Sequence, residues 1–189
     1  MSGRFEVSET ALPGVHLLER KAHSDERGWF ERMYCTIDLA EVLGPRSIVQ
    51  VNRSLTQSKG MVRGLHYQLQ PSAEAKLISC LRGAIFDVAV DVRRNSPTFL
   101  RWHAELLSAE NRRSLFVPEG FAHGFQTVGD ESEVLYFATA AYDPAAERGL
   151  HPLDPRVGIA WPLAVEHLSE RDASHPSLAP DFDGIELSA

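Results

Sequence analysis

Segments in which apolar and polar residues alternate recur along most of the chain, and Gly, Pro, Asn or Ser separates them. In the clearest one, residues 85–93, four apolar side chains fall on one face and three charged side chains on the other, which predicts a half-buried strand. The other segments predict strands at 15–18, 29–34, 48–52, 62–68, 76–81, 102–107, 114–117, 121–127 and 133–138, with a further early strand around Phe5. About ten short strands are typical of an all-β jelly roll or barrel.

Helical signals are few and short. Thr36 has the place of an N-cap for a helix that Gly44 ends, and Ser169 with Asp172 has the spacing of a capping box. Beyond Trp161, scattered prolines and weak periodicity predict a C-terminal segment, 162–189, that wraps over the barrel. We therefore expect one jelly-roll domain, residues 1–189, with a few short peripheral helices.

The composition fits one globular domain, because 43% of the 189 residues are hydrophobic and 24% are charged. No apolar run approaches the ~20 residues needed to cross a bilayer, and the opening MSGRFEVSET lacks the apolar core of a signal peptide. The net charge of -7 argues against a nucleic-acid partner, which requires a basic surface. Cys35 and Cys80 have neither a CxxC nor a Cys/His ligand spacing, so we expect reduced cysteines and a cytoplasmic location.

His66 lies on a predicted strand on which its same-face neighbours are Gly64 and Gln68. A half-buried strand usually turns apolar residues inward, so this polar face fits the lining of a polar cavity. A solvent-facing histidine on the outside of the barrel explains the same pattern equally well. The strand alone leaves both interpretations open.

Residues 117–125 read VPEGFAHGF, a turn followed by a strand that carries Phe121, His123 and Phe125 on one face. The spacing Pro-x-Gly-x-x-His resembles the second signature motif of the cupin superfamily. The strands of cupins form a small jelly-roll barrel, so the resemblance implies a cupin-like fold.

In metal-binding cupins a first motif supplies His-x-His and a glutamate as further metal ligands. The corresponding pair here is His66 and Gln68, and residues 69–73 contain no glutamate. These ligands are too few for a tight transition-metal site, so we expect no metal and no other cofactor. Histidines that hold no metal can exchange protons near neutral pH.

Three further residues have both a chemical and a plain structural explanation. Tyr136 alternates with Val134 and Ala138, so its hydroxyl should enter the barrel, where it could equally meet a structural acceptor. Lys76 begins an otherwise uncharged strand, and a solvated strand end accounts for it as well. Asp172 fits the third position of the capping box at a helix N-terminus. On spacing alone the structural explanation is favoured for Tyr136 and Lys76, and Asp172 is explained by the capping box.

Taken together, these segments resemble the dTDP-4-dehydrorhamnose 3,5-epimerase family from about Asp25 to Asp172. The matching pieces include DERGWFE at 25–31, VRGLHYQ at 62–68, FDVAVDVR at 86–93 and VPEGFAHGF at 117–125. Shorter ones are NRS at 52–54, SPTF at 96–99, LSAEN at 107–111, GIAWP at 158–162 and LSERD at 168–172. Their number and order make chance similarity negligible.

The resemblance implies a homodimer of jelly rolls that acts without a metal on a nucleoside-diphosphate 4-keto-6-deoxy sugar. Carried over by position, it makes His66 the catalytic base and Asp172 its partner. It places Lys76 at the ketone oxygen and makes Tyr136 the acid that returns a proton on the opposite side of the ring. The substrate-binding residues that it implies are Arg63, His123, Arg27, Gln50, Asn52 and Gln68.

This chemistry requires these residue types. A hydrogen on the carbon beside a ketone is weakly acidic, so its removal needs a base such as neutral histidine and a cation at the developing enolate oxygen. Inversion then needs a donor on the far face, because the same base would return the original configuration. Arginine guanidinium groups suit the anionic diphosphate.

Two departures from the family pattern concern specificity. The stretch 52–63 is one residue longer than in typical rhamnose-pathway enzymes, and Ala141 stands where an aromatic residue often precedes the tyrosine. The principal prediction is conversion of dTDP-4-dehydro-6-deoxy-D-glucose to dTDP-4-dehydro-L-rhamnose. The alternatives are a mono-epimerase acting at C3 or C5 only, a metal-dependent cupin oxygenase or isomerase, and a sugar-nucleotide-binding module without catalysis.

Overall fold

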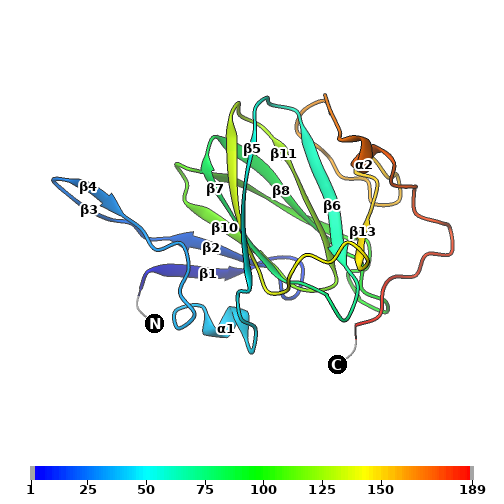
Figure 1. The fold of residues 1–189 in the computed structure, drawn as a ribbon, viewed down its shortest axis with the longest axis horizontal. Coiled ribbons are helices and arrows are strands. Elements are labelled where there is room, and N and C mark those ends of the chain that lie inside the picture. Colours follow the sequence, from blue (N-terminus) through cyan, green and yellow to red (C-terminus); the bar gives the residue numbers. More distant parts are fainter. Residues whose placement is uncertain (1–2, 188–189) are drawn as a thin grey trace.

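Two antiparallel sheets face one another in a computed structural model that describes residues 3–187 (Figure 1). The six-stranded sheet has the order β1 (Phe5–Glu9), β2 (His16–Arg20), β10 (Arg113–Val117), β7 (Lys76–Arg82), β12 (Ser132–Ala138) and β5 (Gln50–Thr56). The five-stranded sheet has the order β13 (Glu147–Gly149), β6 (Val62–Gln68), β11 (Phe121–Thr127), β8 (Ala84–Asp91) and β9 (Trp102–Ser108). The remaining elements are the hairpin β3 (His23–Asp25) and β4 (Gly28–Phe30), and the helices α1 (Ala40–Leu43) and α2 (Glu170–Ala173). No helix of the described residues is long and apolar enough to cross a membrane.

The predicted all-β fold is confirmed, and the predicted strands 62–68 and 121–127 end where β6 and β11 do. The sequence pattern missed β3 and β13, which have three residues each and no room for an alternation. The strand predicted at 29–34 stops at Phe30. The helix predicted from Thr36 begins only at Ala40, because the Thr36 hydroxyl pairs with the Tyr34 hydroxyl at 3.0 Å and caps nothing.

Strand β8 is buried on both faces, so the prediction of a half-buried strand at 85–93 was wrong. Val88 and Val90 do not face the barrel interior. They pack in an outer cluster with C-terminal side chains such as Leu178 and Phe182. The face that carries Asp87 points into the space between the sheets. A polar face is inside here because the barrel contains polar groups that can satisfy it.

The interior of the barrel is apolar at one end. Ile78 and Val134 from the six-stranded sheet meet Phe121 and Phe125 from the five-stranded sheet in the inner core cluster. Close packing of these side chains excludes water. Each Å² of apolar surface buried in this way stabilises the fold by roughly 25 cal/mol. The other end lacks this filling and holds polar groups of both sheets.

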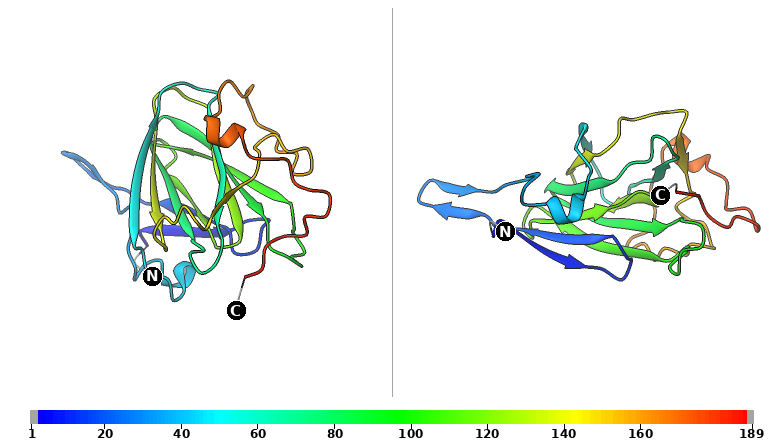
Figure 2. Two further views of the ribbon diagram at one scale, coloured as in Figure 1. Left: turned by 45° about the vertical axis from the view of Figure 1, so that its right-hand side comes forward. Right: turned by 90° about the horizontal axis from the view of Figure 1, so that it is seen from below.

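The C-terminal segment runs along the outside of the five-stranded sheet and carries α2 to the rim of the barrel (Figure 2). Single parallel bridges join Met61 to His167 and Arg93 to Ile185. Ser169 is the N-cap of α2 and accepts a hydrogen bond from the Asp172 amide at 3.1 Å. The segment thereby places α2 beside β6, the strand that carries His66.

Candidate functional site

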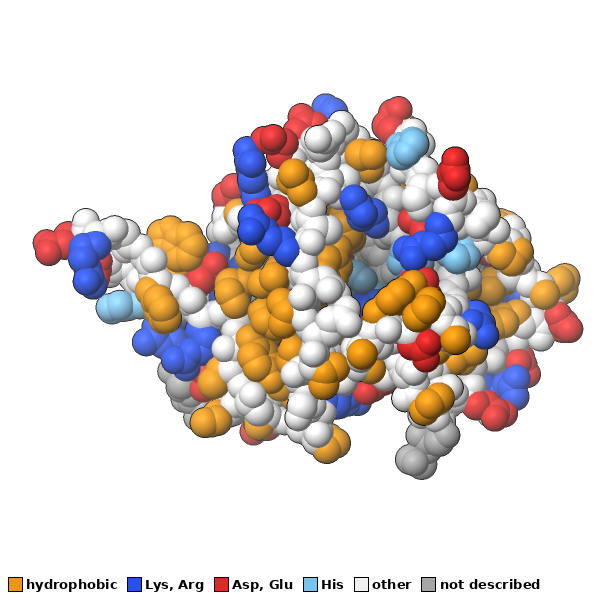
Figure 3. Space-filling view, in the orientation of Figure 1, with side chains coloured by type: hydrophobic (Ala, Val, Ile, Leu, Met, Phe, Trp, Pro, Cys, Tyr) orange, Lys and Arg blue, Asp and Glu red, His pale blue; other side chains and the backbone are white. Residues whose placement is uncertain are grey.

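A cavity of about 820 Å³ opens at the polar end of the barrel. Residues of β5, β6, β7, β11 and β12 line it together with residues near α2. On this face of the molecule, histidine side chains lie recessed beside lysine or arginine side chains (Figure 3). The cavity brings together both sheets and the C-terminal segment, so its lining cannot be read from any one stretch of sequence.

His66 and Asp172 form a hydrogen-bonded pair at the wall of the cavity. His66 Nε2 lies 2.7 Å from Asp172 Oδ1, and their side chains are 19% and 3% exposed. Burial by itself would raise the pKa of Asp172, but hydrogen bonds from His66 and from the Gly64 amide outweigh it and lower the pKa to about 2. The carboxylate is therefore ionised, holds a proton on Nε2 and leaves Nδ1 as the basic nitrogen.

The sequence interpretation of Asp172 as part of a capping box is only half right. Its backbone amide belongs to the N-cap of α2, whereas its carboxylate turns away from the helix to His66 and to the Gly64 amide, 3.2 Å from Oδ2. Gly64 has φ 115, a conformation that favours glycine, and the register of β6 with β11 shifts beside it. This irregularity lets Arg63 and His66 line the same cavity although period two would separate them.

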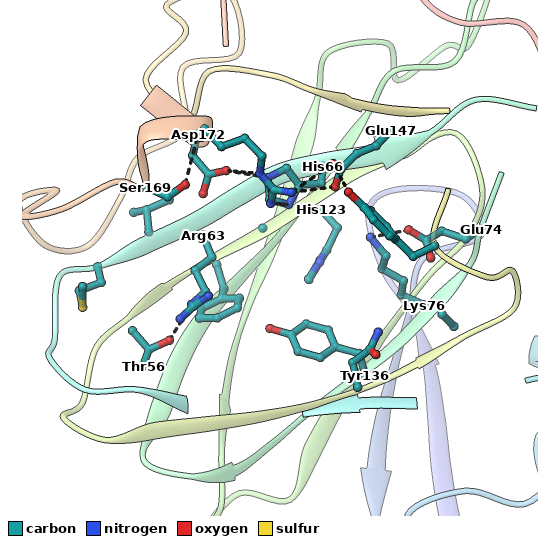
Figure 4. Close-up of a pocket in the computed structure, with 18 of the residues that line it drawn as sticks. Thr56, Arg63, His66, Glu74, Lys76, His123, Tyr136, Glu147, Ser169 and Asp172 are labelled. Carbon is teal, nitrogen blue, oxygen red and sulfur yellow. Dashed lines mark hydrogen bonds and ion pairs between the residues drawn. The ribbon is translucent and has the colours of Figure 1, made fainter. Parts of the chain in front are cut away.

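Tyr136 faces His66 from the opposite sheet. In Figure 4 the two side chains lie on opposite sides of the cavity, with Arg63 and Lys76 at its flanks. The Tyr136 hydroxyl lies 3.1 Å from Ser54 Oγ, and burial raises the pKa of Tyr136 well above its usual range. The phenol therefore keeps its proton at neutral pH and can act as a donor.

Lys76 enters the cavity from the start of β7, so it is not a solvated strand end. Its side chain is 17% exposed and its Nζ lies 2.9 Å from Glu74 Oε1. Both residues line the cavity. A cation held between the two proton-transfer candidates can stabilise negative charge that develops on a bound ligand.

His123 pairs with a carboxylate deep inside the barrel. Its Nε2 lies 2.9 Å from Asp87 Oδ1, and both side chains are almost fully buried. Burial raises the pKa of Asp87, against the opposing effect of His123. The second carboxylate oxygen of Asp87 has no hydrogen-bond partner among the described residues. His123 lines the cavity, and Asp87 lies behind it.

The other residues implied as substrate-binding fall into two groups. Arg63, Gln50 and Asn52 line the cavity, and the Arg63 guanidinium is held by Thr56 Oγ1 at 2.9 Å. Gln68 and Arg27 lie outside the lining.

Gln68 is buried, and backbone groups occupy its amide. Its nitrogen donates to the Ser72 carbonyl and its oxygen accepts from the Asp143 amide at 2.6 Å. Arg27 is on the β3–β4 hairpin, which projects away from the barrel (Figure 1), and its side chain is 84% exposed. In this chain neither residue lines the cavity, so a role for either in substrate binding stays a prediction.

Several residues of the site were missed by the sequence interpretation. Glu147 and Arg171 pair at 3.1 Å at the rim, and the Arg171 guanidinium lies 3.0 Å from His66 Nε2. Glu74 stands two positions before Lys76, and Asp87 was assigned to a solvent face. Their charge alone carried no signal, because charged side chains usually face solvent.

Two sets of side chains in or beside this cavity have residue types that can bind a metal. The cupin-type set does not assemble, because backbone groups occupy Gln68 and Asp87 binds His123. Within residues 3–187, one group of three has ligand atoms that all lie within 4.8 Å of one another, formed by His66, Asp172 and His175. His175 lies two positions beyond the last residue of α2, so its approach to Asp172 depends on the path of the chain after the helix.

Comparisons with known proteins match nearly the whole chain. The family model for dTDP-4-dehydrorhamnose 3,5-epimerase matches residues 9–180. The enzyme of that name from Salmonella typhimurium is 45% identical over 174 residues, which are 91% of this chain and 94% of the relative.

Solved structures agree with these sequence matches. The crystal structure of the 3,5-epimerase of Legionella pneumophila in complex with dTDP-4-keto-L-rhamnose superposes with a TM-score of 0.89 at 38% identity, covering 97% of this chain and all of that one. The 3'-monoepimerase ChmJ of Streptomyces bikiniensis, in complex with dTDP-quinovose, superposes with a TM-score of 0.82 at 35% identity, covering 89% and 85%. The predicted cupin-like fold is therefore confirmed.

Proposed function

Because the chain belongs to the dTDP-4-dehydrorhamnose 3,5-epimerase family, and is thus a sugar-nucleotide epimerase for 4-keto-6-deoxy sugars, we propose that it inverts both C3 and C5 of its substrate. The proposed reaction takes dTDP-4-dehydro-6-deoxy-D-glucose to dTDP-4-dehydro-L-rhamnose. The observation that carries the proposal is the placement of the His66–Asp172 pair on one sheet opposite Tyr136 on the other.

His66 is the proposed base. Its Nδ1 takes the proton from the carbon beside the ketone, and Asp172, 2.7 Å from Nε2, stabilises the imidazolium that results. A positioned base contributes roughly 10²–10⁴-fold, so a second group has to stabilise the enolate. Lys76 supplies that stabilisation at the ketone oxygen, and Glu74 holds the ammonium group in place.

Tyr136 is the proposed acid. It returns a proton to the opposite face of the carbon, which inverts the configuration. Its burial supports this role because the phenol stays protonated until the carbanion forms. His123 lies beside it, with the His123 and Tyr136 rings edge to face at 6.4 Å, and it can offer a hydrogen bond to a sugar hydroxyl while Asp87 holds its Nε2.

The diphosphate of the substrate needs cations at the cavity mouth. Arg63 and Arg171 line the cavity and keep exposed guanidinium edges. Gln50 and Asn52 lie on the same rim and can donate amide hydrogens. These contacts would hold the sugar between His66 and Tyr136, so binding energy far from the reacting carbons supports the chemistry.

The test is an exchange experiment in deuterated water. Candidate dTDP-4-keto-6-deoxy sugars are incubated with the protein, and proton NMR follows each carbon. Deuterium at C3 and C5 with inversion at both supports the proposal. No exchange at either carbon with any sugar of the panel would refute it. A matched variant, His66→Asn, should show no exchange.

Mono-epimerisation is the second candidate, because ChmJ, a 3'-monoepimerase, is among the similar structures. The same experiment separates the two, since a mono-epimerase gives an inverted product at one carbon only. The metal-dependent oxygenase or isomerase has less support, because backbone groups already occupy the Gln68 amide in the cupin ligand position.

We also propose that the protein is a homodimer. Strand β5 is an edge of its sheet, and Val51 and Leu55 on it and Val49 just before it are exposed. The projecting hairpin exposes Trp29 and Phe30 at 61% each. A second copy that covers these side chains would bring Arg27 near the neighbouring cavity. Sedimentation equilibrium tests the dimer, and a monomer at micromolar concentration would contradict it.

Both cysteines are free, which supports the cytoplasm as the location, and cell fractionation checks it.

A further inference from the structure

His175 is the one histidine beside the His66–Asp172 pair that the proposed reaction does not use. It follows α2, and its ring meets the His66 ring edge to face with centroids 5.9 Å apart. Its Nε2 is buried and has no hydrogen-bond partner in the described part of the chain. A buried nitrogen without a hydrogen-bond partner destabilises the folded chain.

Gly149 makes room for this ring. A Cβ atom at position 149 would stand 2.1 Å from His175 Nε2, well inside contact distance. Gly149 is also the β13 residue that pairs with His66 across the ladder. The backbone is thus shaped so that His175 lies directly against the strand pair that carries the base.

Two imidazoles and one carboxylate are a common ligand set for zinc and related ions. Two ligands at Zn–N or Zn–O distances of about 2.0–2.2 Å can be at most about 4.4 Å apart. The ligand atoms of His66, Asp172 and His175 lie within 4.8 Å of one another, so shifts below about 1 Å bring them to one ion. The Gly64 amide already orients the Asp172 carboxylate, as a supporting hydrogen bond does at a metal site.

We propose that His66, Asp172 and His175 form a reversible site for a borderline divalent cation such as Zn²⁺, and that the bound ion holds the epimerase inactive. The ion binds His66 on the Nε2 side that faces Asp172, so the ring proton moves to Nδ1 and blocks the lone pair with which His66 would accept a proton. The ion also takes the carboxylate that stabilises the imidazolium. The inhibitory part rests on the proposed function, whereas the ion site itself does not.

Arg171 is the charge that opposes an ion at this position. Its guanidinium lies 3.0 Å from His66 Nε2 and 3.5 Å from Asp172 Oδ1. The side chain is 52% exposed and also pairs with Glu147 at 3.1 Å. An ion therefore displaces Arg171 from His66 while Glu147 keeps it as a partner. Removing this positive charge should strengthen ion binding, which is the reverse of the effect expected for His175.

The ion site is tested by metal titration of the full chain after removal of bound metal with a chelator. ZnCl₂ binding is followed by calorimetry and CoCl₂ binding by visible absorption. We expect one ion per chain, at least tenfold weaker binding in His175→Phe, and tighter binding in Arg171→Gln. His103→Phe is the matched control, because it removes a half-buried histidine from β9 and should leave the affinity unchanged.

His175→Ala serves as a second variant. The phenylalanine ring in His175→Phe could collide with Gly149, whereas the small alanine side chain cannot. Absence of stoichiometric binding, or equal affinity in both His175 variants and the wild type, would overturn the site.

Inhibition is measured separately by deuterium exchange into the keto sugar. Zn²⁺ at saturating concentration should abolish exchange in the wild type, excess chelator should restore it, and the His175 variants should resist it. Full exchange with the ion bound would overturn the inhibitory role. A chain that exchanges nothing even in chelator would refute the proposed function, while the titration would still decide the ion site.

Discussion

Replacing Asp172 with asparagine should separate the chemical role of this side chain from its structural one. The carboxylate accepts two hydrogen bonds, from His66 Nε2 at 2.7 Å and from the Gly64 amide at 3.2 Å. Asparagine has nearly the same shape but presents one amide group in place of an acceptor oxygen. If that group faces His66, it donates to Nε2 and moves the histidine proton to Nδ1, where the base needs a lone pair.

The expected kinetic effect of Asp172→Asn is a fall in kcat of roughly 10²–10⁴-fold, the range for loss of a correctly protonated general base. KM should change little, because Asp172 is 2% exposed and reaches a ligand only through His66. The rate of deuterium exchange at the acidic carbons, measured by NMR, should fall by the same factor as the turnover.

The effect on stability follows from the pKa of Asp172, which is about 2 in the folded chain against an ordinary value of 3.8. A shift of nearly two units corresponds to roughly 2 kcal/mol of stabilisation of the folded state. Because the folded pKa is the lower one, this contribution is complete above about pH 4 and is lost as the pH falls through 2. The variant, which has no carboxylate there, should lack this dependence.

Urea unfolding of both proteins at several pH values between 2 and 7 measures the difference. We expect the free energy of unfolding of the wild type to exceed that of the variant by about 2 kcal/mol at pH 6, and the two values to be nearly equal at pH 2. Glu170→Gln is the control, since it removes an exposed carboxylate from the same helix and should leave kcat unchanged. A variant with wild-type exchange rates, or a stability difference that is constant with pH, would show that this account of Asp172 is wrong.

Four further substitutions test the rest of the site. Tyr136→Phe should lower inversion roughly 10²–10⁴-fold while NMR still detects exchange with retention, and equal loss of both would contradict its role as the acid. Lys76→Met should lower kcat, measured as turnover at saturating substrate, roughly 10²–10³-fold, and Glu74→Gln should lower it clearly less. Equal effects of the two substitutions would mean that Lys76 is not the group that stabilises the enolate oxygen. Gly64→Ala puts a Cβ 2.7 Å from Gly124 Cα at a backbone φ of 115. It should lower the free energy of unfolding, measured in urea, by about 3 kcal/mol. A loss below about 1 kcal/mol would mean that the backbone adapts.

Much of the fold was predictable because its strands are local patterns. β6 and β11 follow from alternation and turn residues alone, and Ser169 announces α2 by its capping position. The prediction failed for β8, because its apolar face does not mark the barrel interior. In β8 the apolar face is turned outward and covered by the C-terminal segment, and nothing within residues 85–93 indicates that cover.

The candidate site was predictable only in part and for a similar reason. The residue types of His66, Lys76 and Tyr136, together with the family resemblance, indicated proton transfer beside a ketone. Gln68 shares a strand with His66, yet its amide is taken up by backbone groups of two loops, which no alternation pattern describes. His175 is close to Asp172 in the chain, but its meeting with His66 depends on the tertiary structure.

The sequence by itself determined where the strands lie and which side chains could move protons. Only the tertiary structure decided which of them meet. His66 and Asp172 are 106 positions apart, and their contact depends on the pairing of β6, the irregularity at Gly64 and the path of the C-terminal segment. Local patterns report how a side chain relates to its own strand, whereas the meeting of distant groups depends on how sheets pair and loops close, which is a property of the whole chain.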